Sequence, residues 1–145
     1  MNSDSNKLWQ DRIYLLLGGI FIASLISSNL IFQKFFFWTP FAFLVNPDSR
    51  NWVSWLSEYT FELSVGILPY PITFLVTDII SEIYGREKAN RVVMVGFIAS
   101  IFIMGVVMVG DMVSATQWSP VDDSVFHRVF GLFGPAVFAS MAAYI

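Results

Sequence analysis

"PYPITFLVTDIISEIYGREKANR", Pro69 to Arg91, is the stretch that decides how this chain folds. It opens with two prolines inside an apolar run, carries Asp78 and Glu82, and ends in a basic cluster. Proline interrupts a helix because it lacks a backbone N–H, and a carboxylate is costly inside hydrocarbon. The fold therefore depends on whether this stretch crosses a membrane.

The composition is that of a membrane protein. Of the 145 residues, 56% are apolar and only 13% are charged, whereas about 25% of an ordinary soluble domain is charged. The mean hydropathy is +0.65. The sequence therefore predicts an all-α, polytopic integral membrane protein, with the lipid bilayer as its main partner.

The same composition disfavours several function classes. The net charge of −3 provides no basic surface for nucleic acid. There is no cysteine and His127 is the single histidine, so we expect no metal site and no cofactor. A glycine-rich phosphate loop is absent, and one interfacial histidine cannot serve a Ser-His-Asp triad. We therefore expect a protein that is not an enzyme.

Four apolar runs predict membrane spans at about 13–32, 63–83, 92–110 and 129–145, because about 20 apolar residues cross the hydrocarbon core. Small residues four apart in these runs are interpreted as helix-packing positions: Ser24 and Ser28, Gly96 and Ser100, Ala136 and Ser140.

Between the first two runs, Trp52, Trp55, Leu56 and Tyr59 have helical spacing and predict a short helix on the membrane interface. An aromatic anchor is the favoured interpretation of that helix, over a platform for a ligand.

Basic residues predict the orientation. Lys7, Arg12, Arg86, Lys88 and Arg91 belong to one side of the membrane by this span order. The other side mixes Lys34, Arg50 and Arg128 with five acids. The positive-inside rule then places the N-terminus and the 84–91 loop in the cytoplasm.

Depth distinguishes the two carboxylates of the opening stretch. If the second span centres near Thr73, Asp78 lies roughly 7 Å from the midplane and Glu82 roughly 13 Å from it. Water and headgroups reach Glu82, whereas an aspartate near the centre costs about 2.5–3.5 kcal/mol. We therefore expect Asp78 to face a polar cavity, a ligand or a partner such as Asn29 in "SSNL".

The prolines indicate an interruption of the same span. Pro71 cannot donate to the carbonyl of Ile67, nor Pro69 to that of Val65. Inside a bilayer, protein or cavity water must satisfy those carbonyls. A broken helix near a buried acid is how transporters build midplane binding sites. A simple proline kink between packed helices is the alternative.

The motif P-x-T-F-L-x-T-D-x-x-x-E-x-Y-G, followed by basic residues, resembles the queuosine precursor transporter family, formerly described as putative vitamin uptake. "SNLIFQKFF", at residues 28–36, and "ASMAAYI", at residues 139–145, extend the resemblance. The motif residues here are Pro71, Thr73, Thr77, Asp78, Glu82, Tyr84 and Gly85.

The resemblance implies an inner-membrane importer of 7-deazaguanines, chiefly 7-cyano-7-deazaguanine and 7-aminomethyl-7-deazaguanine. Asp78 is expected to accept the two adjacent N–H donors of the guanine-like edge. Glu82 is a second contact or a proton carrier, Asn29 reads the ring carbonyl, and Tyr70 stacks on the ring. Thr73 and Thr77 complete the expected substrate site.

Similar proteins have about six spans, so we interpret residues 1–145 as the N-terminal part of a single transporter domain, a fragment rather than a natural short form. Two further interpretations stay open. The chain could be a substrate-capture subunit of an ATP-driven uptake system, or a membrane protein without transport activity in which Asp78 and Glu82 only pair helices. A homo-oligomer also stays open.

Overall fold

The computed structural model describes residues 3–41 and 59–142. Its long elements are the helices α1 (Ser3–Ile31), α3 (Tyr70–Tyr84) and α4 (Arg86–Met112). The shorter elements are the strands β1 (Phe35–Trp38) and β2 (Phe61–Ser64), the 3-10 helix η2 (Val65–Ile67), and the helices α5 (Asp123–Phe130) and α6 (Phe133–Ala142).

Three helical stretches are long and apolar enough to cross a membrane: Lys7–Ile31, Val65–Tyr84 and Arg86–Met112. The predicted all-α membrane fold is confirmed, with one short hairpin added to it. The helices extend beyond the apolar runs because polar residues at the membrane surface continue the same backbone hydrogen bonding. The run predicted as a fourth span, 129–145, holds the end of α5 and all of α6, and its residues 143–145 lie outside the described ones.

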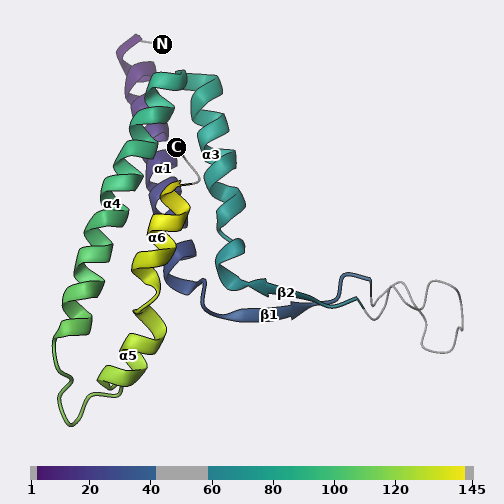
Figure 1. Cartoon of the computed structure of the whole chain (residues 1–145). Coiled ribbons are helices and arrows are strands. Elements are labelled where there is room, and N and C mark those ends of the chain that lie inside the picture. Colours follow the sequence, from purple (N-terminus) through teal and green to yellow (C-terminus); the bar gives the residue numbers. More distant parts are fainter. Residues whose placement is uncertain (1–2, 42–58, 143–145) are drawn as a thin grey trace, which may run out of the picture.

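The long helices form a bundle in which α1 and α4 run in the same direction and α3 runs in the opposite one (Figure 1). A single residue, Gly85, joins α3 to α4. Its φ of 86° and ψ of 160° lie in a region that is essentially restricted to glycine. From this turn the two helices diverge, and α6 packs against α4 and α1 in front of them (Figure 1).

The core lies where the three long helices meet. Its buried apolar residues are Phe21, Leu25, Val76, Ile80, Ala89 and Val92. A Cβ on Gly96 would lie only 2.7 Å from the ring of Phe21. Glycine therefore lets α1 and α4 approach closely, which confirms the packing role predicted for Gly96.

A two-stranded antiparallel hairpin leaves the bundle sideways at the end opposite the N-terminus (Figure 1). Phe35 pairs with Ser64 and Trp38 with Phe61, whose ring centroids are 6.2 Å apart. No strand was predicted here. The predicted interfacial helix at 52–59 falls on residues 52–58, outside the described ones, except for Tyr59, which is not helical.

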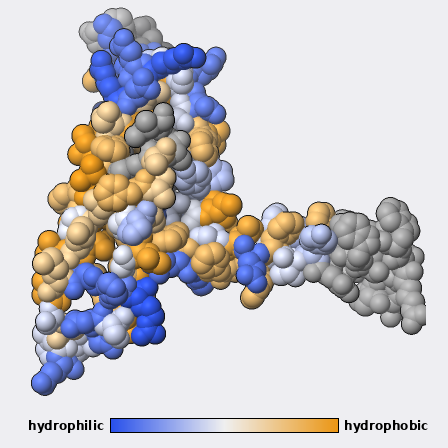
Figure 2. All heavy atoms as spheres, viewed as in Figure 1, coloured by the Kyte–Doolittle hydropathy of each residue, from blue (hydrophilic) through white to orange (hydrophobic). Residues whose placement is uncertain are grey.

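Two polar segments meet at the end of the bundle where the chain begins (Figure 2). The N-terminal part of α1 and the α3–α4 turn lie together at one hydrophilic end, above an apolar middle (Figure 2). Tyr84 Oη on α3 donates to the carbonyl of Gln10 at 2.9 Å, which fixes these segments side by side. The basic residues predicted to share one side of the membrane therefore belong to segments at one end of the molecule.

Candidate functional site

The second membrane span is irregular near its start. The 3-10 helix η2 ends at Ile67, and α3 begins at Tyr70 with Pro71 in its first turn. Proline is tolerated there because the first N–H groups of a helix have no partner within it. Leu68 and Pro69, between η2 and α3, keep right-handed helical backbone angles, and Val65–Tyr84 forms one candidate span. The span therefore changes from a 3-10 helix to an α-helix near Pro71, as a local irregularity rather than the unwound break that was predicted, and the prolines open α3.

Two serine hydroxyls, one on α1 and one at the end of β2, satisfy backbone carbonyls near this junction. Ser28 Oγ donates to the carbonyl of Gly66, and Ser64 Oγ donates to the carbonyl of Phe32. Ser64 also accepts from the Gly66 amide at 3.1 Å and so caps η2. A Cβ on Gly66 would lie 2.6 Å from the Ser28 carbonyl oxygen, so glycine allows the contact.

Two threonines line α3 beyond the η2–α3 junction. Thr73 is fully buried, and its hydroxyl donates to the carbonyl of Tyr70 at 2.6 Å. The Thr77 hydroxyl donates to the carbonyls of Thr73 at 3.0 Å and Phe74 at 2.9 Å. Because the hydroxyl proton of Thr77 is committed to backbone and its side chain is only half-buried, Thr77 offers a ligand an acceptor, whereas Thr73 is enclosed by the helix packing. The ring of Tyr70 packs edge-on against Phe74, with centroids 5.3 Å apart.

Asp78 and Glu82 lie on a different face of α3. The face toward α1 and α4 is formed by Thr73, Val76 and Ile80, which are buried, whereas both carboxylates are exposed. Within residues 3–41 and 59–142, neither acid makes a hydrogen bond or an ion pair. Asp78 is therefore an exposed carboxylate in the candidate span Val65–Tyr84, and it has no polar partner among the described residues.

Asn29 is not close to Asp78. It is buried on α1, beside Ser28, which contacts Gly66. Gly66 precedes Asp78 by twelve residues, or about 18 Å at 1.5 Å per helical residue. The candidate residues thus separate along the span: Asn29 and Tyr70 lie near the η2–α3 junction, Thr73 and Thr77 follow, and the two acids come last.

The sequence-based prediction missed one polar group. Ser100 is 2% exposed, and its Oγ has no hydrogen-bond partner in the described part of the chain. It was interpreted only as a packing position. A signal was present, because Ser100 is the one polar side chain of the sequence between Arg91 and Asp111, and buried hydroxyls normally find a partner.

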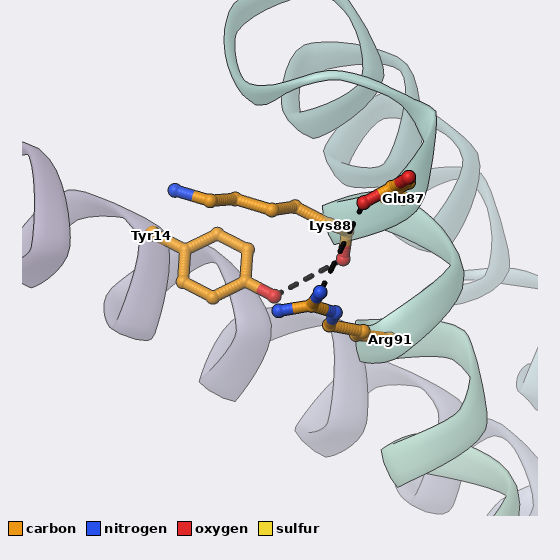
Figure 3. Close-up of polar contacts among 4 residues, drawn as sticks. All are labelled: Tyr14, Glu87, Lys88 and Arg91. Atoms are coloured by element: carbon orange, nitrogen blue, oxygen red, sulfur yellow. Dashed lines mark hydrogen bonds and ion pairs between the residues drawn. The ribbon is translucent and has the colours of Figure 1, made fainter.

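A cluster of aromatic and basic side chains locks the hydrophilic end. The Lys88 ammonium lies 5.3 Å from the ring centroid of Tyr14 and 5.1 Å from that of Tyr84. The Tyr14 hydroxyl donates to the Lys88 carbonyl at 3.0 Å (Figure 3). This clamp connects α1, α3 and α4, and it sets the position of α3, which carries both acids.

An acidic side chain within a membrane span is a candidate functional residue, as in the ion and substrate pathways of transporters. Comparison with known families supports that class. A family model described as "Putative vitamin uptake transporter" matches residues 64–145, from the cap of η2 through α6. The chain therefore belongs to this family. No curated protein and no solved structure matches the chain.

Proposed function

We propose that this chain imports 7-deazaguanine precursors of queuosine, chiefly 7-cyano-7-deazaguanine and 7-aminomethyl-7-deazaguanine. Family membership supports uptake of a small vitamin-like molecule. The finer assignment rests on the resemblance of the motif from Pro71 to Gly85 to queuosine precursor transporters. One observation is chemically compatible with it: Asp78 lies exposed in the second candidate span and has no polar partner within residues 3–41 and 59–142.

Asp78 is the proposed anchor of the base. A guanine-like edge presents two adjacent N–H donors, and an ionised carboxylate accepts both through its two oxygens. Such charge-assisted pairs are about twice as strong as neutral hydrogen bonds. Hydrogen bonds from the base to Asp78 would also offset the free-energy cost of an aspartate at this depth in the membrane, because the carboxylate gains donors and the base gains an acceptor.

The other candidates act at different levels of the span. Glu82, one turn closer to the hydrophilic end, is a second contact or a proton carrier. Tyr70, Thr73 and Asn29 lie toward the η2–α3 junction. Because about 18 Å separates the level of Asn29 from Asp78, one base cannot contact both at once in this arrangement. We propose that Asn29 and Tyr70 meet the substrate at an earlier stage than Asp78.

We place the protein in the inner membrane with its N-terminus in the cytoplasm. The support is that the first part of α1, whose sequence includes Lys7 and Arg12, and the turn before the basic 86–91 segment lie at the same end of the bundle. The chain has no cysteine, so single cysteines at Ser3 and Ser119 can report sidedness without background. A membrane-impermeant maleimide added to intact cells should label the cysteine at 119 and not the one at 3; the reverse pattern contradicts the orientation.

The substrate assignment is tested by queuosine in tRNA. The host should be unable to make 7-deazaguanines, lack its own importer, and receive a low dose of 7-cyano-7-deazaguanine. Queuosine above the empty-vector level supports the proposal. If an immunoblot finds the chain in the membrane but no queuosine forms, the experiment is repeated with a hybrid protein that carries further spans of a relative. Queuosine formation by the hybrid would mean that residues 1–145 alone do not suffice for transport. No queuosine with the hybrid would mean that the proposed substrate is wrong.

The same assay addresses the alternative of a capture subunit. Uptake that requires a co-expressed ATPase would identify an ATP-driven system. Uptake that persists without one, and collapses when the proton gradient is dissipated, would identify secondary transport. Membrane level is measured in each condition, so that loss of uptake is not confused with loss of protein.

A further inference from the structure

A groove between α1 and α4 lies apart from the η2–α3 junction and from both acids. It has a volume of about 300 Å³. Apolar side chains and glycines line most of it, chiefly Gly18, Gly19 and Ile22 on α1 and Val92 and Val95 on α4, and no lining residue comes from α3, α5 or α6. One end is formed by Tyr14 and Arg91.

The groove exists because α1 carries two consecutive glycines. A Cβ on Gly18 would lie 3.6 Å from Val92, in ordinary contact, whereas a Cβ on Gly19 would have nothing within 4 Å. Just beyond, Phe21 packs tightly on Gly96 and holds the helices together. The groove is therefore a fixed feature of the α1–α4 packing, open to the bilayer at Gly19.

Its position in the membrane follows from α4. The run from Val92 to Gly110 carries no charge and is about 28 Å long as a helix, close to the thickness of the hydrocarbon core. Arg91 directly precedes this run, at the level of lipid phosphates. The groove extends along α4 from Arg91 to Val95, so it enters hydrocarbon at the depth of the first part of an acyl chain.

The positive charge of Arg91 is available at the mouth. Its ion pair with Glu87 is long, at 3.9 Å, and the two side chains are 73% and 92% exposed, so the pair is weak. Lys88 instead occupies the space between the two tyrosine rings. Figure 3 shows Arg91 extending from α4 beside the Tyr14 hydroxyl.

We propose that this groove binds one anionic glycerophospholipid, with its phosphate on Arg91 and an acyl chain along Gly18 and Gly19. Basic sites between membrane helices at the cytoplasmic side bind anionic headgroups. The small volume fits a hydrocarbon chain and excludes a helix about 10 Å wide, which disfavours a second copy of the chain. This proposal does not depend on the proposed substrate.

Native mass spectrometry of the full chain, released from detergent, tests the proposal. The protein is offered equimolar phosphatidylglycerol and phosphatidylcholine with identical acyl chains. One bound lipid is expected, with about a fivefold preference for phosphatidylglycerol, the effect of about one basic residue near the membrane surface. Arg91→Gln should reduce the preference to about onefold, and Glu87→Gln should increase it.

Filling the groove tests the acyl-chain part separately. Gly19→Leu should remove the bound lipid of either kind. Gly105→Leu is the matched control, because a Cβ on Gly105 also has nothing within 4 Å and its surroundings, Ile101, Phe102, Val106 and Val109, carry no charge. Arg86→Gln controls for loss of a charge at the same end. Both controls should bind lipid as the wild type does.

Three results would overturn the proposal. Gly19→Leu could retain the phosphatidylglycerol, or Arg86→Gln could lose the preference as fully as Arg91→Gln does. Alternatively, the wild type could be a dimer that Gly19→Leu converts to a monomer, which would show that a second copy covers the groove. Circular dichroism of each variant checks that its helices are intact, and Gly19→Ala provides a milder filling if Gly19→Leu fails to fold.

Discussion

Gly66→Ala is the substitution for which the structure provides the most direct estimate. The added Cβ would lie 2.6 Å from the Ser28 carbonyl oxygen and 2.9 Å from Phe32 Cβ. The Ser28 oxygen belongs to the backbone of α1, so a rotamer change cannot relieve the overlap, and η2 must move away from α1. Overpacking of this kind costs about 1–3 kcal/mol.

The movement also weakens two hydrogen bonds, from Ser28 to Gly66 and from Ser64 to Phe32. Hydrogen bonds between membrane helices contribute on average about 0.6 kcal/mol each. The expected total loss of unfolding free energy is therefore about 2–4 kcal/mol.

Unfolding by sodium dodecyl sulfate in mixed micelles, followed by circular dichroism, measures this loss. Gly105→Ala is the control, because its Cβ would meet nothing within 4 Å, and alanine in a helix is favoured over glycine by about 1 kcal/mol. That variant should be as stable as the wild type or more stable. The close approach of η2 to α1 would be refuted if Gly66→Ala unfolded within about 0.5 kcal/mol of the wild type, well below the overpacking cost.

Three further predictions concern the turns and the clamp. Gly85→Ala should lower stability by about 1–3 kcal/mol in the same assay, because its φ of 86° and ψ of 160° strain any side chain; an unchanged midpoint contradicts the turn geometry. Lys88→Met should cost about 0.5–2 kcal/mol by removing both cation–π contacts, and Arg86→Met, at the same turn, should cost less. Ser124 and the Val125 amide donate to Asp122, and these hydrogen bonds hold the pKa of the Asp122 carboxyl below its ordinary value of 3.8. The stabilisation of α5 by this carboxylate is therefore fully present above pH 3.8. It is lost as the pH falls through the lower pKa of the folded state. The protection of the Val125 amide, that is, its hydrogen-exchange rate relative to the intrinsic rate at the same pH, should therefore decrease at strongly acidic pH, and this decrease should be weaker in Asp122→Asn.

The membrane helices could be predicted from sequence because the signals are local. Apolar runs of about 20 residues locate spans whatever surrounds them, and Pro69 and Pro71 mark where α3 begins. Gly85 and the basic residues after it mark the α3–α4 turn.

The contacts of the η2–α3 junction could not be predicted in the same way. Ser28 and Gly66 are 38 residues apart, and only the packing of α1 on η2 brings them together. The hairpin was missed because "FFFW" has neither the polar alternation of an amphipathic strand nor a nearby partner in sequence. Its partner strand takes up Leu63 and Ser64, the beginning of the run predicted as the second span.

The candidate site shows the same division. Depth along a helix follows from sequence, so the levels of Thr73 and Asp78 could be estimated beforehand. The direction in which each side chain points could not be predicted, because it depends on which side of α3 packs against α1 and α4. The structure places Thr73 inward and Asp78 outward, which makes Asp78 available to a ligand or to a partner beyond the described residues.

The central claim is that Asp78 holds the imported base, and Asp78→Asn tests it most directly. The amide keeps the size of the side chain but replaces one acceptor oxygen with a donor, so it cannot accept two adjacent N–H groups through two oxygens. Queuosine in tRNA should fall to the empty-vector level with the variant at wild-type abundance in the membrane, while Asp111→Asn, at the far end of α4, should leave it unchanged. Wild-type queuosine in the Asp78→Asn cells would contradict the account.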